Sequence, residues 1–168
     1  MHRSPRRRLP ASYVRSFVFG VEDSIVSTVG LISGIAAAGV PTRTVILTGT
    51  VLILVEAFSM AVGDFLSEES SESYVQRKEV SARMPLVAGA IMFGSYLISG
   101  LIPLLPYTLM PAERAFWVSI KLSLIALALL GIARGRASGI GVFKSSIRTV
   151  LIGGVAILVG IGVGALVQ

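Results

Sequence analysis

Three long uncharged runs limit what this chain can fold into. Residues 24–42, 84–112 and 149–168 contain no Asp, Glu, Lys or Arg. A helix of about 20 apolar residues crosses the ~30 Å hydrocarbon core of a bilayer, so each run is long enough for one span. Of the 168 residues, 54% are hydrophobic and only 14% are charged, whereas a soluble domain carries about 25% charged residues. The sequence therefore predicts an all-α integral membrane protein.

Hydropathy and turn residues divide the chain into five predicted transmembrane helices. A basic tail (1–12) precedes one membrane domain (13–168), whose spans are expected at about 14–39, 44–67, 85–105, 112–133 and 146–167, with the second span continuing as an acidic cytoplasmic helix (68–83). Pro103, Pro106 and Pro111 are expected to form the loop between the third and fourth spans. A Gly-rich basic link, 134–145, is expected before the last span.

The distribution of Lys and Arg predicts the orientation, because cytoplasmic segments carry an excess of these residues. A cytoplasmic N-terminus would place most of the cations inside: Arg3, Arg6, Arg7, Arg8, Arg15, Arg77, Lys78, Arg83, Arg134, Arg136, Lys144 and Arg148. Only Arg43 and Arg114 would lie in outer loops, and Lys121 lies within the fourth span. We therefore expect a multi-pass membrane protein with its N-terminus in the cytoplasm and its C-terminus outside.

Composition argues against several function classes. The chain has no Cys, and its single His is His2, so a thiolate or imidazole metal centre and a nucleophilic dyad are not expected. No serine lies in a nucleophile-elbow motif, and neither enzymatic activity nor a resident cofactor is predicted. The net charge is +6, and the Arg residues that contribute to it lie beside the spans. This position favours lipid headgroups over nucleic acid as the partner. No apolar region of a removable signal peptide precedes the first span.

The second span carries a row of polar side chains into the membrane. Glu56, Met60, Asp64, Glu68 and Glu72 recur at intervals of four, and such residues lie on one face of a helix. A carboxylate in hydrocarbon costs several kcal/mol unless it is paired or hydrated, so this face is expected to line a path or a site.

The first span supplies the facing carboxylates. A rise of ~1.5 Å per residue places Glu22 and Asp23 about 12 Å from the cytoplasmic end of that helix, close to the predicted depth of Met60. A carboxylate beside a thioether favours a transition metal over Mg²⁺ or Ca²⁺. The candidate metal ligands are Glu22, Asp23, Glu56, Met60, Asp64, Glu68 and Glu72.

Each candidate also has a purely structural alternative. The alternative ion pairs are Asp23 with Arg15, Glu56 with Lys121, and Glu72 with Arg77. Met60 could be core filler, and Asp64 an ordinary residue at a helix end. The acidic end of the second helix, with Glu68, Glu69, Glu72 and Glu79, could be a solvated face or could collect cations. Glycines of the first and last spans, such as Gly30 and Gly34, suit close helix packing, within the chain or across a dimer.

Three segments resemble the vacuolar iron transporter family. FVFGVEDSIVSTVGLISG (17–34) is similar to its first-span signature, VEAFSMAVGDFLSEESSESY (55–74) to its second, and KSSIRTVLIGGVAILVG (144–160) to its C-terminal helix. The resemblance implies a five-span, typically dimeric exporter that moves Fe²⁺, and often Mn²⁺, from the cytoplasm in exchange for protons. It also implies that Asp23 and Met60 line the metal path.

The sequence departs from the family pattern in three places. Only about 18 residues separate the second and third spans, which resembles the short, nodulin-like and prokaryotic branch without a cytoplasmic metal-binding domain. This resemblance implies a location in a prokaryotic plasma (inner) membrane. Leu52 stands where some members have an acid, and Ser24 replaces the usual Gly.

These observations together predict a proton-coupled transporter that exports Fe²⁺ or Mn²⁺ as its substrate. The predicted partners are divalent metal ions, protons, the lipid bilayer and a second copy of the chain. Two alternatives stay open: a non-transporting membrane sensor or assembly protein, and a transporter of a different cation.

Overall fold

Five α-helices make up the computed structural model, which describes residues 10–78, 81–139 and 141–167. The helices are α1 (Ala11–Ala37), α2 (Thr42–Gln76), α3 (Arg83–Leu109), α4 (Ala112–Ser138) and α5 (Val142–Leu166). Each is long and apolar enough to cross a membrane, and no strand occurs in the described ranges. The predicted all-α fold with five spanning helices is therefore confirmed.

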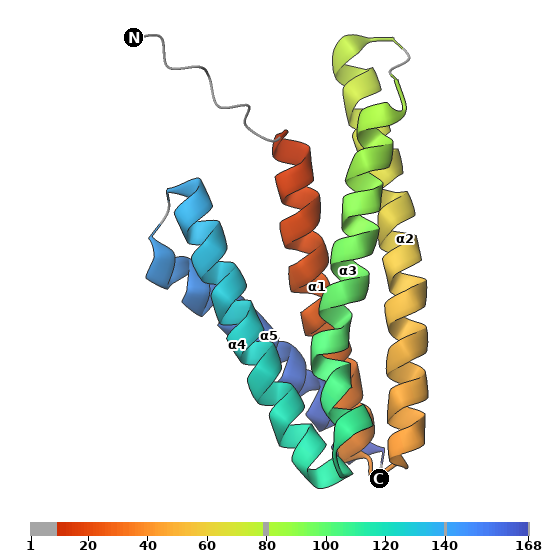
Figure 1. Cartoon of the computed structure of the whole chain (residues 1–168), viewed down its shortest axis with the longest axis vertical. Helices are drawn as coiled ribbons and strands as arrows, with labels where there is room; N and C mark the ends of the chain where they lie inside the picture. Colours follow the sequence, from red (N-terminus) through yellow and green to blue (C-terminus); the bar gives the residue numbers. More distant parts are fainter. Residues whose placement is uncertain (1–9, 79–80, 140, 168) are drawn as a thin grey trace.

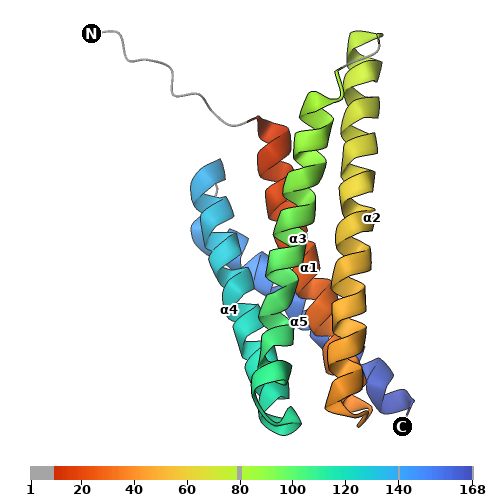
Figure 2. The same cartoon turned by 45° about the vertical axis from the view of Figure 1, so that its right-hand side comes forward.

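Successive helices run in opposite directions, so their ends lie at the two ends of the bundle. The start of α1, the end of α2, the start of α3 and the α4–α5 turn lie at one end, and the remaining turns lie at the other (Figures 1 and 2). The first end, called the basic end here, holds the described cations Arg15, Arg77, Lys78, Arg83, Arg134, Arg136, Lys144 and Arg148. Arg43 and Arg114 lie at the opposite end. That the basic end faces the cytoplasm stays a prediction.

Helices α1 and α3 form the centre of the bundle. Helix α1 packs against all four other helices and α3 against α1, α2 and α4, and twelve residues of α3 are buried. Helix α2 has only four buried residues, and none of its described residues beyond Ala57 is buried. The predicted ligand face of α2 therefore lies at the edge of the bundle, against α1 and α3.

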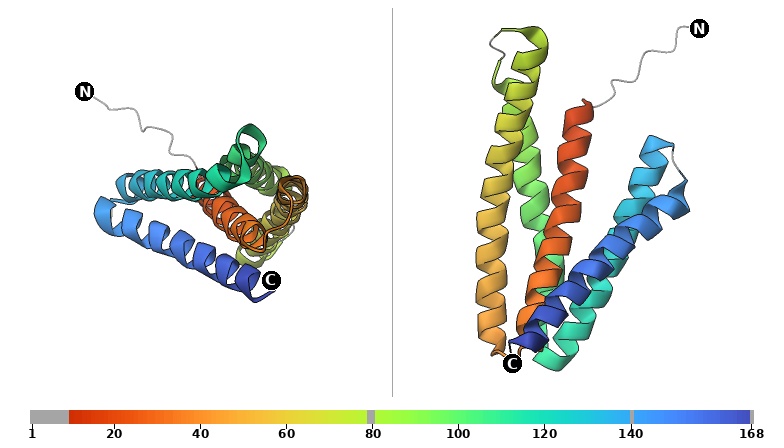
Figure 3. Two further views of the ribbon diagram at one scale, coloured as in Figure 1. Left: turned by 90° about the horizontal axis from the view of Figure 1, so that it is seen from below. Right: turned by 180° about the vertical axis from the view of Figure 1, so that it is seen from behind.

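Glycines allow α5 to cross α1 at close range (Figure 3). A Cβ atom at Gly34 would lie 2.5 Å from the carbonyl oxygen of Gly160, and added Cβ atoms at Gly160 and Gly164 would collide with the backbone at Gly30 and Gly34. Any larger side chain here would separate the helices, as at other small-residue crossings in membranes. The predicted role of these glycines in helix packing is met within a single chain.

Two turns differ from the predicted boundaries because of backbone conformation. Helix α2 ends at Gln76, and not near Arg83, because Arg77 adopts a left-handed conformation with φ of 51°. The predicted acidic helix is correspondingly shorter. The predicted link 134–145 is also shorter, since α4 continues to a left-handed cap at Gly139 (φ 67°) and α5 begins at Val142.

Two of the three prolines predicted to lie in a loop are inside a helix. Pro103 and Pro106 are buried within α3, which continues to Leu109. Prolines are tolerated in membrane helices where neighbouring helices and hydroxyl groups satisfy the backbone. The Ser119 hydroxyl of α4 donates to the carbonyl oxygen of Pro103 at 2.7 Å and connects the two helices at this point.

Candidate functional site

A chain of hydrogen bonds joins three helices near the middle of the bundle. The Tyr96 side chain of α3 is 0% exposed, and its hydroxyl donates to Glu56 Oε2 of α2 at 3.2 Å. The same phenolic oxygen lies 2.8 Å from Ser27 Oγ of α1. The Ser24 hydroxyl donates to the main-chain carbonyl of Tyr96 at 2.6 Å. These four residues and Asp23 are called the central cluster.

Asp23 belongs to the central cluster by its place on α1. It lies directly before Ser24 and one turn before Ser27, whose side-chain oxygen contacts the Tyr96 phenol that donates to Glu56. Asp23 has no hydrogen bond or ion pair in the described part of the chain, and Glu56 Oε1 has no partner there either. Two carboxylates in one cluster without a cationic partner repel each other. A bound cation would relieve that repulsion.

The central cluster is not a closed metal site built from acids alone. No three Asp, Glu, His or Cys side chains within the described ranges lie close enough together to hold a metal ion. Further ligands to a cation at Asp23 and Glu56 would have to come from hydroxyls, main-chain carbonyls, water or a second copy of the chain.

Met60 lies in a neighbouring pocket, nearer the basic end. The pocket has a volume of about 430 Å³ and is lined by Arg15, Phe19, Met60, Gly63, Asp64, Ser67 and Met92. It brings Met60 together with Asp64, as the helical spacing predicts, but its lining does not include Asp23. Met92 of α3 supplies a second thioether, and Gly20 leaves room for it, because a Cβ atom there would lie 3.1 Å from the Met92 sulfur.

A group of charged and hydroxyl side chains lies between the Met60 pocket and the basic end of the bundle. The Arg15 guanidinium of α1 contacts Asp64 Oδ1 at 3.4 Å and Glu68 Oε2 at 2.8 Å, and the Ser16 hydroxyl donates to Asp64 Oδ2 at 2.6 Å. The Arg15 side chain is 56% exposed, whereas those of Asp64 and Glu68 are 8% and 12% exposed. These four residues are called the mouth cluster.

The other candidate residues have different surroundings. Glu22 forms an ion pair with Arg134 of α4 at 3.1 Å, and Arg134 Nε also donates to Ser145 Oγ of α5 at 3.3 Å. Glu22 is therefore held in an interhelical contact. Glu72 lies half-buried on the last turns of α2.

None of the three alternative ion pairs forms between the described residues. Arg15 pairs with α2 and not with Asp23, Glu56 bonds to Tyr96 and not to Lys121, and Glu72 forms no ion pair with Arg77. Glu79 lies outside the described residues.

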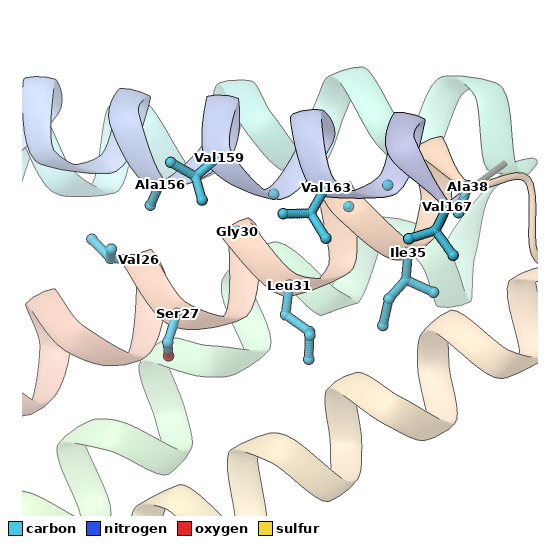
Figure 4. A pocket seen from close by; sticks show the side chains of 13 residues that line it. Val26, Ser27, Gly30, Leu31, Ile35, Ala38, Ala156, Val159, Val163 and Val167 are labelled. Atoms are coloured by element: carbon cyan, nitrogen blue, oxygen red, sulfur yellow. The ribbon is translucent and has the colours of Figure 1, made fainter.

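The groove between α1 and α5 is lined almost entirely by apolar residues. Its volume is about 520 Å³, and Figure 4 shows valines, glycines and other apolar residues around it. Ser27 contributes the only side-chain hydroxyl to this lining, and no charged residue belongs to it. The carboxylates and thioethers described above lie outside this groove.

Sequence reasoning missed the residues of α3. Tyr96 and Met92 lie in an uncharged run, so neither hydropathy nor charge marks them. Their spacing of four on one helix face was the available signal, since it places a hydroxyl and a thioether one above the other.

Five spanning helices that enclose carboxylates at mid-depth define an integral, multi-pass membrane protein of the transporter class, because intramembrane acids mark ion pathways. The family model described as "VIT family" matches residues 14–84 and 75–165. The chain belongs to this family, as its motifs predicted, and it is a transporter rather than an enzyme. Its length agrees with a member that lacks the cytoplasmic domain.

Relatives in plants match most of the chain. Vacuolar iron transporter homolog 3 of Arabidopsis thaliana is 30% identical over 158 residues, covering 86% of this chain and 77% of the relative. Vacuolar iron transporter homolog 1 of the same plant is 28% identical, over 94% of this chain and 84% of the relative. Vacuolar iron transporter 1 of Oryza sativa subsp. japonica is 24% identical, over 99% and 90% respectively.

Proposed function

We propose that this protein exports Fe²⁺ from the cytoplasm in exchange for protons, and that Mn²⁺ is a second cargo. The proposed location is a prokaryotic plasma membrane, with the basic end on the cytoplasmic side. The observation that carries the proposal is the central cluster, in which Asp23 and Glu56 have no cationic partner among the described residues. The names of the matched relatives, which are vacuolar iron transporters and their homologs, support iron as the cargo.

The proposed path passes the mouth cluster, the Met60 pocket and the central cluster, in that order. A cation from the cytoplasm first meets Asp64 and Glu68 of the mouth cluster, then the thioethers of Met60 and Met92, and then the central carboxylates. Thioether sulfur binds soft metals better than hard ones, so the middle of the path favours Fe²⁺ over Mg²⁺ and Ca²⁺.

Proton exchange follows from competition at the same oxygens. A carboxylate that holds a proton binds a metal ion poorly, and a bound metal ion drives the proton off. If Asp23 and Glu56 bind a metal ion when they are open to one side of the membrane and protons when they are open to the other, metal and protons move in opposite directions. The predicted homodimer is part of this proposal, because a second copy could complete the ligand set.

The decisive experiment is metal flux in proteoliposomes that contain the full chain. We expect saturable Fe²⁺ and Mn²⁺ flux that depends on a pH gradient, with Zn²⁺ as a comparison ion. The Asp23→Ala variant should lose at least about 100-fold of the Fe²⁺ flux, because one of the two central carboxylates is gone. Glu113→Ala is the matched control, since Glu113 is an exposed carboxylate at the opposite end of the bundle.

Two results would contradict the proposal. Full Fe²⁺ transport by a folded Asp23→Ala variant would remove the central cluster from the mechanism. Absence of flux for all three metals with the wild-type chain would favour a sensor or assembly role, or a different cation.

A further inference from the structure

We propose that Tyr96 is a positioning residue for the cargo: its hydroxyl holds Glu56 of α2 at the turn of α1 that carries Asp23 and Ser27, and so sets the affinity for the metal ion. The inference rests on the proposed function, in which Asp23 and Glu56 receive the cation. It adds a second residue of α3, after Met92, to a path that is otherwise built from α1 and α2.

Hydrogen bonds hold Tyr96 both at its main chain and at its side-chain hydroxyl. Its main-chain carbonyl accepts the Ser24 hydroxyl at 2.6 Å, and its phenolic oxygen lies 2.8 Å from Ser27 Oγ and 3.2 Å from Glu56 Oε2. With the ring 0% exposed, the hydroxyl cannot reach water and has these two side chains as its partners. It therefore connects α1 to α2 through α3.

The packing around Tyr96 also restricts its backbone. Gly100, one turn further along α3, lies so close to both neighbouring helices that a Cβ atom there would be 2.8 Å from Ile53 Cγ1 and from Ser24 Oγ. Closely packed interiors do not deform continuously. The phenol is thus held at a set position relative to both α1 and α2.

The hydrogen bond has a direct consequence for Glu56. Tyr96 occupies Oε2, and Oε1 has no partner in the described part of the chain. Carboxylates that bind metals are commonly oriented by such a second hydrogen bond, and its loss typically costs about 10–100-fold in metal affinity. Tyr96 thereby leaves one oxygen of Glu56 for the cargo and prevents the side chain from rotating away.

The same helix provides a matched control. Tyr107 is also buried, at 3% exposed, but its hydroxyl has no hydrogen-bond partner among the described residues. Tyr96→Phe and Tyr107→Phe therefore remove the same atom from two buried rings of α3, and only the first removal breaks a contact to Glu56.

The first test measures the Fe²⁺ concentration dependence of flux in proteoliposomes of the full chain. Tyr96→Phe should raise KM about tenfold and leave the maximal rate within about twofold, because ligand placement is lost while both carboxylates remain. Tyr107→Phe should change neither value by more than about twofold. Ser27→Ala, which removes the other partner of the phenol, should raise KM about threefold.

The second test asks whether Tyr96 acts through Glu56. Fe²⁺ binding to purified protein is measured by anaerobic equilibrium dialysis, so that variants without transport are still informative. Tyr96→Phe should weaken binding about tenfold in the wild-type background and less than twofold in the Glu56→Gln background, since coupled residues are not additive.

The outcomes separate this inference from the proposed function. Absence of Fe²⁺ flux in the wild type would overturn both. Normal wild-type flux with an unchanged KM in Tyr96→Phe, or equal losses in the two backgrounds of the binding cycle, would overturn the positioning role alone. If Tyr96→Phe does not purify as a folded protein, an unchanged KM in Ser27→Ala overturns it.

Discussion

The mouth cluster and the central cluster hold their carboxylates in opposite ways. At the mouth, Asp64 and Glu68 share the guanidinium of Arg15. At the centre, Asp23 and Glu56 have no ion pair, and a phenol is the only group that bonds to Glu56 in the described part of the chain. Both clusters connect α1 to α2, and the central cluster also includes α3. The difference therefore comes from which side chains surround the acids.

The difference follows from where each cluster lies in the bundle. Arg15 is 56% exposed, and a long cationic side chain near a helix end can move its charge into water while its stem stays in place. In the proposed path, the mouth therefore exchanges its own cation for a metal ion. A fixed cation at mid-membrane could not leave, because the low dielectric there strengthens its pairing with acids. The proposal therefore assigns the centre to the cargo.

The most direct way to break this contrast is to give the centre its own cation. In the Asp23→Lys variant, the new ammonium group would pair with Glu56 and remove the repulsion between the two acids. We expect Fe²⁺ flux to fall at least about 100-fold while the thermal midpoint of unfolding stays at or above the wild-type value. Proteoliposome flux and thermal unfolding in detergent measure the two effects. Flux within tenfold of the wild type would show that the centre does not need to be free of cations.

The opposite change removes the cation from the mouth. Arg15→Gln leaves Asp64 and Glu68 without their ion pair, so these acids become available to metal. We expect KM for Fe²⁺ to fall about threefold, with only a small loss of stability, because exposed ion pairs contribute about 0–1 kcal/mol. Arg15→Lys keeps the charge and is the control. A higher KM in Arg15→Gln would mean that Arg15 helps to load the cargo and does not compete with it.

The comparison also explains how much the sequence could predict. The five helices follow from long apolar runs, and the ligand face of α2 from its spacing of four, since both are local properties of the chain. The pairing of Arg15 with residues 49 and 53 positions away depends on how α1 packs beside α2. No local pattern records that packing, and the alternative pair Arg15–Asp23 was equally consistent with the sequence.

The contribution of α3 was hidden for a different reason. Hydrophobic periodicity marks a helix with one wet face, but α3 is in contact with three other helices and has little polar contrast. Pro103 and Pro106 are turn signals in water, yet here both are buried inside α3, which packs against three other helices. Tyr96 and Met92 could be assigned to the site only once the helices were placed together.

The smallest expected effect concerns Glu22, the neighbour of Asp23. Its pair with Arg134 is partly buried, with side chains 17% and 30% exposed, and it connects α1 to α4 rather than to the metal path. We expect Glu22→Gln to keep Fe²⁺ flux within about twofold and to lower the thermal midpoint by a few degrees, because about 1 kcal/mol shifts the midpoint by about 2–4 °C in a protein of this size. Arg134→Gln should lower the midpoint by a similar amount, and the double variant should lose little more than either single change. A flux loss in Glu22→Gln that approaches that of Asp23→Ala would contradict this prediction. Glu22 would then belong to the metal path together with the central carboxylates, and not to a supporting ion pair.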